Sequence, residues 1–154
     1  MTKTPPSTQD SEPPAPPQAG FEWDDSISYG DTRVDEDHHR LAHLIERLQL
    51  MESRQPDRQL AHAVFNDLME FAMTHFSHEE DLLRKSGYPH AFEHALAHER
   101  VLGAMIEFTS TLMDQPAQGL PATCRQLREL VCHHHSTEDG AAADWMARYP
   151  GGSR

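Results

Sequence analysis

The stretch THFSHEEDLLRKSGYPHAFEHALAH, residues 74–98, contains the pattern that decides the fold. His75 and Glu79 are four residues apart, and so are His94 and His98. On an α-helix such a pair projects from one face, about 6 Å apart along the axis. The segment RKSGYP between the pairs contains Gly and Pro and predicts a turn, so the two helices should run antiparallel with their polar faces opposed. Burying these side chains is costly unless a partner such as a metal ion satisfies them.

Length and charge exclude several classes of protein. A chain of 154 residues can form one domain with a sizeable core but not two of ordinary size. The formal charge of −12 argues against nucleic acid and anionic membranes as partners, and no Gly-rich phosphate loop is present. No run approaches the ~20 apolar residues of a membrane span, and no apolar stretch near the N-terminus indicates a secretory signal. We therefore expect a soluble, cytoplasmic protein.

The N-terminal region divides into a tail and an arm. Residues 1–20, MTKTPPSTQDSEPPAPPQAG, are rich in Pro, Ser and Thr, and they predict a disordered tail. From residue 21 the sequence FEWDDSISYGDTRV introduces larger side chains that could anchor an extended arm on the domain, or form a partly ordered linker. The domain boundaries expected are thus 1–20 for the tail and 21–154 for the bundle. The anchors are Trp23, Ile27, Tyr29 and Val34.

The first helix should begin near Asp35, a good N-cap, and end by Pro56. His39 and His43 lie about 100° from its inward face, which indicates solvated side chains. The inward face, repeating at three and four residues, is His38, Leu41, Ile45 and Leu48.

The second helix is expected from about residue 57 to 85, and the third from Pro89 to about Met113. His62 and His78 lie off the inward face of the second helix and are interpreted as surface residues. His90 is a rival to His94 on the third helix, but its place at the helix start favours either an exposed position or one that supports a ligand without binding the metal itself. The expected inward residues are Val64, Leu68, Phe71, His75, Glu79 and Leu82, then His94, His98, Leu102, Met105, Phe108 and Leu112; Met69, Met73, Met105 and Met113 are interpreted as core residues.

The fourth helix should start with Pro121 in its first turn and carry Leu127, Leu130 and His134 inward. His133 and His135 lie one position either side of His134 and are less favoured, although the sequence does not exclude His135. Asp139 is five residues after His134, which on an ideal helix leaves the side chains about 140° apart. Joint use of both requires a local distortion of the helix, or a site broad enough for the carboxylate to reach a second metal.

The C-terminal region holds both cysteines. Cys124 and Cys132 are eight residues apart in one expected helix, about 12 Å along the axis. A disulfide spans at most ~7 Å between Cα atoms, so two free thiols are expected. The last segment, AAADWMARYPGGSR, predicts a short helix packed by Trp145 and Met146 that ends by Pro150.

The four helices together predict an all-α, up-down-up-down four-helix bundle whose interior holds histidines at one level. Five imidazoles and two carboxylates exceed what one metal ion needs alongside an open position, and they suit two ions that share the carboxylates. Any single histidine of this set could instead be a buried residue that binds no metal. That alternative does not explain a whole set that lies in phase on four helices. The set is His38, His75, Glu79, His94, His98, His134 and Asp139.

The strings VDEDHHRL, HFSHEE, YPHAFEHALAHE and HHSTED, one on each expected helix, resemble the hemerythrin family, specifically bacterial single-domain hemerythrins. The resemblance covers roughly residues 21–145. It implies a non-haem di-iron centre, bridged by an oxo or hydroxo group, that binds O2 reversibly. It also implies a role for each residue of the set: His94, His98 and His134 would hold one iron, His38 and His75 the other, and Glu79 and Asp139 would bridge them, with Leu41 and Phe76 lining the O2 pocket.

Two positions depart from the family. Leu130 stands where the family often has Trp, and His135 stands where an apolar residue is usual. A smaller wall and a polar neighbour could admit water or donate a hydrogen bond to bound dioxygen. Both would alter autoxidation of the iron rather than its ligation.

The resulting hypothesis is an O2-binding protein for oxygen storage, delivery, transport or sensing, monomeric and without a catalytic acid, base or nucleophile. A di-iron enzyme acting on peroxide, nitric oxide or iron is the alternative, and a site for another metal is a third. A ferritin-like oxidase is disfavoured, because those sites use two Glu-x-x-His motifs and this chain has one such string, Glu36 to His39, off the inward face. The tail would be a contact for a separate protein partner or a solubility aid.

Overall fold

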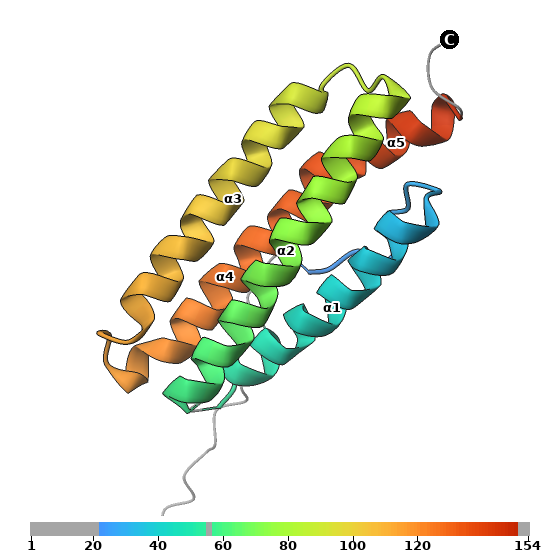
Figure 1. The fold of residues 1–154 in the computed structure, drawn as a ribbon. Helices are drawn as coiled ribbons and strands as arrows, with labels where there is room; N and C mark the ends of the chain where they lie inside the picture. The colour runs from blue at the N-terminus through green and yellow to red at the C-terminus, as the bar shows by residue number, and fades with distance from the viewer. Residues whose placement is uncertain (1–21, 55–56, 151–154) are drawn as a thin grey trace, which may run out of the picture.

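The computed structural model describes residues 22–54 and 57–150, and within them it is an up-down-up-down four-helix bundle (Figure 1). Each long helix packs against the next in the chain, and the fourth closes the bundle against the first. The all-α bundle expected from the sequence is confirmed. The predicted tail, residues 1–20, lies outside the described residues. The four long helices are α1 (Thr32–Glu52), α2 (Arg58–Ser86), α3 (Ala91–Leu112) and α4 (Leu120–His134).

Helix α1 starts earlier than predicted, because Asp31 and not Asp35 is its N-cap. The Asp31 carboxylate accepts hydrogen bonds from the backbone N–H groups of Arg33 and Val34, at 3.1 and 3.0 Å. Asp35 lies inside the helix, and its carboxylate accepts from the backbone N–H of Tyr29 at 2.8 Å. The residue expected to cap the helix therefore fastens the end of the arm to it.

The boundaries of α2 and α3 follow their capping residues. Asp57 caps α2 by accepting from the backbone N–H of Gln59. Gly87 ends α2 in the left-handed region, with φ of 77°, where a side chain would be strained. Its backbone N–H bonds the carbonyl of Arg84, and α3 follows from Ala91. The predicted turn between the two helices is confirmed.

The fourth helix is not regular along its whole length. A short 3₁₀ turn, η1 (Ala117–Gly119), precedes α4, which has Pro121 in its first turn. After His134 the chain makes one π-helical turn, η2 (His135–Asp139), and continues as α5 (Gly140–Arg148). The short C-terminal helix expected from the sequence is thus joined to α4 through a widened turn.

Apolar residues fill the bundle in two clusters, one on each side of the level that holds the histidines. The larger cluster includes Leu48, Phe65, Leu68 and Leu127, each at most 1% exposed. The smaller one contains Tyr29, Val34, Leu83, Ala142 and Ala143. Several residues predicted to face inward are only partly buried against these clusters: Phe71, Leu82, Leu102, Phe108 and Leu130.

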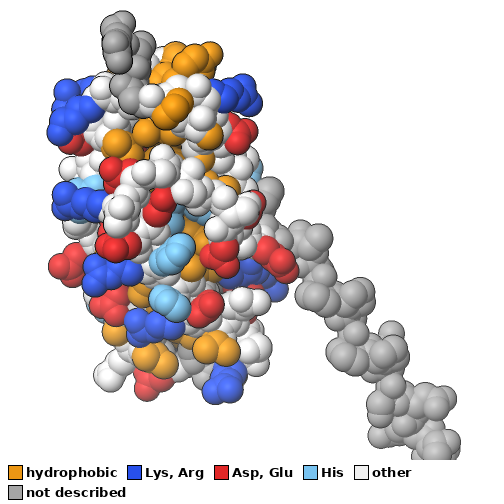
Figure 2. Space-filling model, turned by 90° about the vertical axis from the view of Figure 1, so that its right-hand side faces the viewer, with side chains coloured by type: hydrophobic (Ala, Val, Ile, Leu, Met, Phe, Trp, Pro, Cys, Tyr) orange, Lys and Arg blue, Asp and Glu red, His pale blue; other side chains and the backbone are white. Residues whose placement is uncertain are grey.

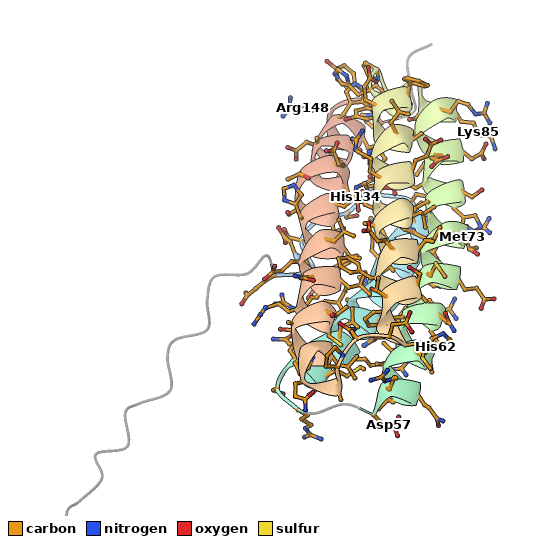
Figure 3. All side chains as sticks on the ribbon, turned by 90° about the vertical axis from the view of Figure 1, so that its left-hand side faces the viewer. Asp57, His62, Met73, Lys85, His134 and Arg148 are labelled. Carbon is orange, nitrogen blue, oxygen red and sulfur yellow. The ribbon has the colours of Figure 1, made fainter. Side chains whose placement is uncertain are left out.

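Sulfur-containing residues divide between the core and the surface. Cys124 and Cys132 are buried and free, as predicted. Met105 is buried, but Met73 and Met113 are 58% and 52% exposed, so the prediction that all four methionines fill the core is wrong for these two. Figure 3 shows Met73 on the outer side of α2. Their positions on the helix, and not their apolar character, decide exposure.

The arm, residues 22–31, has neither helix nor strand and leads to the start of α1; part of it is visible between α2 and α1 in Figure 1 (blue). Tyr29 is buried, and Trp23 and Ile27 are half-buried against the bundle. The arm therefore lies on the domain, as one of the two sequence interpretations held. None of the helices in the described ranges is both long enough and apolar enough to cross a membrane.

Candidate metal centre

The structure brings all seven predicted residues to one level of the bundle interior, which we call the polar layer. Each long helix supplies at least one of them, and none is more than 5% exposed. His134 lies in the half of the bundle nearer to Lys85 and Arg148, away from the start of α2 at Asp57 (Figure 3). The polar layer consists of His38, His75, Glu79, His94, His98, His134 and Asp139.

Potential ligand atoms in the polar layer form two overlapping groups. Within each group the atoms lie within 4.8 Å of one another, close enough to contact one cation. Glu79 and Asp139 belong to both groups, and each histidine belongs to one. The first group is Glu79, His94, His98, His134 and Asp139, and the second is His38, His75, Glu79 and Asp139.

Donor atoms of the polar layer point at one another. His134 Nε2 is 3.0 Å from Asp139 Oδ1, and His98 Nε2 is 3.2 Å from Glu79 Oε2. The Nε2 atoms of His94 and His98 are 3.1 Å apart. His75 Nε2 faces Glu79 Oε2 at 3.5 Å. Lone pairs converging on a common centre are the arrangement that a cation stabilises.

The π-helical turn explains how His134 and Asp139 serve the same centre. On a regular helix a spacing of five residues would separate the two side chains by about 140°. The widened turn from His135 to Asp139 moves the carboxylate back onto the inward face. The local distortion left open by the sequence is observed, and Asp139 also belongs to both groups of potential ligand atoms. Single π turns of this kind occur frequently at functional sites.

Many polar atoms in this layer are buried without a partner. In the described part of the chain, both ring nitrogens of His38 and of His75, and both carboxylate oxygens of Glu79, lack a hydrogen bond of good geometry. The same holds for His134 Nε2 and Asp139 Oδ1 despite their short separation. Burying such groups unpaired costs free energy, and native proteins seldom tolerate several together. Bound cations would satisfy them, so the residues present fit a metal pair.

Electrostatics also indicate a place for positive charge. Burial lowers the pKa of His75 to about 4, which keeps its imidazole neutral as a metal ligand requires. Burial of His94 is outweighed by its contacts with Asp139 and Glu79, and the pKa of His94 rises to about 10. Burial alone would raise the pKa of the Glu79 and Asp139 carboxyl groups, but the neighbouring histidines hold both pKa values below their ordinary values. Without a metal, a proton on His94 supplies positive charge beside these carboxylates, and a bound cation would supply that charge instead.

Acidic side chains outside the layer orient two of its histidines. His98 Nδ1 is 2.8 Å from Glu80 Oε1, which fixes the ring and leaves Nε2 to the centre. Asp37 is buried, and its Oδ2 is 3.7 Å from His75 Nδ1 and 3.1 Å from His78 Nδ1. His78 is therefore half-buried between helices, and its interpretation as a surface residue is wrong.

Histidine 135 is the residue that the sequence argument underrated. It is 1% exposed, and its Nδ1 lies 3.0 Å from Asp139 Oδ2. The regular helical repeat placed His135 off the inward face, but the π turn changes that repeat. The sequence did contain a signal for this distortion. Asp139 follows His134 by five residues, and only a distorted helix can bring both side chains to the same face.

The remaining histidines and the expected pocket walls lie mostly where predicted. His39, His43, His90 and His133 are exposed. His62, like His78, is interpreted from the sequence as a surface residue but is half-buried, and it accepts a hydrogen bond from Asn66. Of the walls, Leu41 is buried in the larger apolar cluster. The ring of Phe76 is also buried and stacks on His98 with 3.8 Å between centroids.

Comparison with known proteins agrees with this geometry. The family model described as hemerythrin HHE cation binding domain matches residues 30–146. A bacteriohemerythrin of Stenotrophomonas maltophilia is 25% identical over 123 residues, which cover 79% of this chain and 78% of that protein. A bacteriohemerythrin of Pseudomonas aeruginosa is 26% identical over 86 residues, 56% of each chain. A hemerythrin-like protein of Naegleria gruberi is 31% identical over 80 residues, 52% of this chain and 61% of that one.

Fold and site together define a four-helix bundle with a buried, two-part cluster of metal-ligating side chains. The family match extends over well more than half of the sequence and includes every residue of that cluster. The chain belongs to the hemerythrin HHE cation-binding family, as the motifs on its four helices indicated.

Proposed function

We propose that this protein binds dioxygen reversibly at a pair of non-haem iron ions held by the polar layer. The observation that carries the proposal is the presence of two donor groups that share two carboxylates. Relatives named bacteriohemerythrin support iron as the metal, since the donor types alone also suit other ions. Storage, delivery, transport and sensing are all roles that such binding would serve.

The two donor groups suggest different tasks for the two ions. His94, His98 and His134 would complete one ion together with the shared carboxylates. His38 and His75 would hold the other, which has one histidine fewer and so an open position for dioxygen. Glu79 and Asp139 would bridge the pair, because each belongs to both groups.

Dioxygen would enter a pocket whose walls give it little to react with. A bound iron pair supplies the electrons that dioxygen takes up on binding and returns on release. Phe76 and Leu41, both at most 4% exposed, would keep water and protons away from the ligand. The layer is rich in histidine and has only two carboxylates, whereas oxygen-activating sites in bundles are rich in carboxylate.

An optical titration tests this function. The reduced, iron-loaded protein is exposed to O2, which is then removed under inert gas, while the visible spectrum is recorded. We expect an absorption band that forms with O2 and disappears on its removal. His75→Ala removes a ligand of the more open ion and should abolish the band, whereas His43→Ala, on an exposed helix face, should leave it intact. Equal effects of the two substitutions would show that the proposed site is wrong.

A second candidate function is an enzyme acting on peroxide, nitric oxide or iron. The specific observation in its favour is His135, a polar side chain 3.0 Å from Asp139 where the family pattern is apolar. In the same titration an enzyme would show irreversible oxidation with steady consumption of added reductant. The monomeric state and cytoplasmic location remain predictions.

A further inference from the structure

His135 connects the polar layer to the N-terminal arm. Its Nδ1 is 3.0 Å from Asp139 Oδ2, and its Nε2 is 3.0 Å from the backbone oxygen of Asp24. Its ring lies flat on Trp23, with centroids 3.7 Å apart and planes within 4°. The imidazole thus contacts a carboxylate of the candidate centre on one edge and the arm on the other edge and one face.

The arm covers the side of the polar layer that has fewer ligands. The rings of Trp23 and Tyr29 lie edge-on to His38, with centroids 6.2 and 5.5 Å away. Trp23 also lines a groove of about 980 Å³ bounded by the arm, α1 and α4. Figure 2 shows the side of the bundle on which α1 lies, where histidine, acidic and basic side chains are interspersed. Trp23 therefore stands between this groove and His38.

The two ends of the arm are attached differently. At the end next to α1, the Tyr29 backbone bonds Asp35, and the Tyr29 ring is buried. At the other end, Trp23 is half-buried and Asp24 is exposed. The stacking on His135 and the hydrogen bond to the Asp24 carbonyl hold that end against the bundle. Segments with few buried contacts open at low free-energy cost, so these contacts control whether the arm lies closed.

We propose that His135 is a positioning residue that holds the arm closed over the His38 side of the polar layer and fixes the Asp139 carboxylate. Through the arm it limits the access of water and small anions from the groove to the more open metal position. The contacts of His135 with the arm, the stacking on Trp23 and the hydrogen bond to Asp24, are made by protein atoms alone. The effect on access rests on the proposed function, because it concerns the ion held by His38 and His75.

The first experiment uses metal-free protein. In a Trp145→Phe background Trp23 is the only tryptophan of the sequence, and its fluorescence reports the arm. His135→Ile fills the position with an apolar side chain and removes both polar contacts and the stacking. We expect a red-shifted emission, stronger quenching by acrylamide, and roughly tenfold faster hydrogen exchange of residues 22–31. The one hydrogen bond from His135 to the arm contributes about a factor of five to the opening equilibrium, and the stacking on Trp23 adds a further factor of about two or more. His135→Gln, which can keep one polar contact, should give an intermediate effect.

Two controls separate this effect from general destabilisation. His43→Gln removes an imidazole from the same groove without contact to Asp139, and it should leave Trp23 quenching unchanged. Far-UV circular dichroism during heating verifies that each variant is folded at the temperature of measurement. If folded His135→Ile and His135→Gln both keep wild-type quenching and exchange of the arm, the proposal is overturned.

The second experiment tests access in the iron-loaded, oxidised protein with azide as the probe. The rate of the spectral change after mixing should rise about as much as arm exchange does in the metal-free form, and Trp23→Ala should raise it at least as much. If the arm opens in the metal-free variant but azide reacts at the wild-type rate, arm-controlled access is wrong. Failure of the wild type to bind iron would reject the proposed function, while the metal-free result would still decide whether His135 holds the arm.

Discussion

The two halves of the bundle interior use the same helical positions for opposite purposes. Each of four histidines in the polar layer is seven residues, or two turns, from an apolar residue of the larger cluster, and all eight side chains are at most 5% exposed. Equal burial therefore has different consequences in the two halves. The pairs are His38 with Ile45, His75 with Leu68, His98 with Met105, and His134 with Leu127.

The apolar half stabilises the fold by itself, whereas the polar layer needs a ligand. Apolar burial lowers the free energy of the folded state by about 25 cal/mol per Å² without any partner. Unpaired imidazoles and carboxylates raise it, until a cation satisfies them. Substitutions in the apolar half should thus change stability, and substitutions in the polar layer should change metal binding. Three substitutions and one change of pH test this difference.

The largest effect is expected for Glu79→Gln in the polar layer. Glu79 is fully buried and belongs to both donor groups, so loss of its charge should weaken both ions at once. Metal analysis after gel filtration should find less than one ion per chain. The stabilisation by bound metal, about 4 kcal/mol where free metal is a thousand times its Kd, should disappear from thermal unfolding. Glu70→Gln, on an exposed face of α2, is the control, and full metal content in Glu79→Gln would contradict the bridging role.

In the apolar half, Leu68→Ala should reduce the free energy of unfolding by about 3 kcal/mol, because it leaves a cavity where a fully buried side chain was. The loss should be equal with and without metal, and metal content should stay at the wild-type level. Urea denaturation of both forms measures it. Leu60→Ala, which truncates a leucine on the same helix that is 50% exposed, should change stability by less than ~0.5 kcal/mol. A Leu68→Ala protein that folds but loses its metal would show that the halves are coupled.

A smaller effect is expected at the edge of the polar layer. Glu80→Ala removes the carboxylate that is 2.8 Å from His98 Nδ1, so the ring loses its orienting contact. Metal affinity on the side of His94 and His98 should fall about tenfold, at the low end for such contacts, because the Glu80 side chain is 40% exposed. Competition with a chelator of known affinity measures the change. Glu99→Ala alters an exposed neighbour of His98, and an equal loss there would remove the reason for the assignment.

The smallest effect concerns the thiols of the apolar half. Burial raises the pKa of Cys124 and of Cys132 to about 11, from an ordinary value of 9.0. Between these pH values the unfolded chain loses thiol protons that the folded chain keeps, so the contribution of the thiols to stability should be constant below pH 9 and decline as pH rises towards 11. Urea midpoints at pH 8 and pH 10.5 measure the decline, and a Cys124→Ala, Cys132→Ala protein should show less of it. An identical decline in that protein would place its cause elsewhere.

The helices and the buried set could be predicted because both depend on a simple repeat. The spacing of His75 from Glu79 and of His94 from His98 identifies inward faces, and a turn with Gly87 between them sets the antiparallel order. These features are local, so they survive folding unchanged. The prediction failed at Met73, whose apolar character indicates a core residue although it lies outside the inward repeat; it is on the outer side of α2.

The contacts around the buried set could not be predicted, because they depend on packing between distant segments. Asp31 and Asp35 are both good capping residues, and only the path of the arm decides which one caps α1. His78 contacts Asp37 from another helix, 41 residues away in sequence. His135 contacts Asp24 across 111 residues, and no helical repeat carries that information.

The π-helical turn from His135 to Asp139 would have to be kept if this cluster of side chains were built into an idealised helical bundle. Two consecutive residues, His134 and His135, each contact one carboxylate oxygen of Asp139, at 3.0 Å in both cases. On an ideal helix only His135, four residues before Asp139, would remain near the carboxylate. His134, five residues before it, would project about 140° away. A designer would have to copy the irregularity along with the side chains.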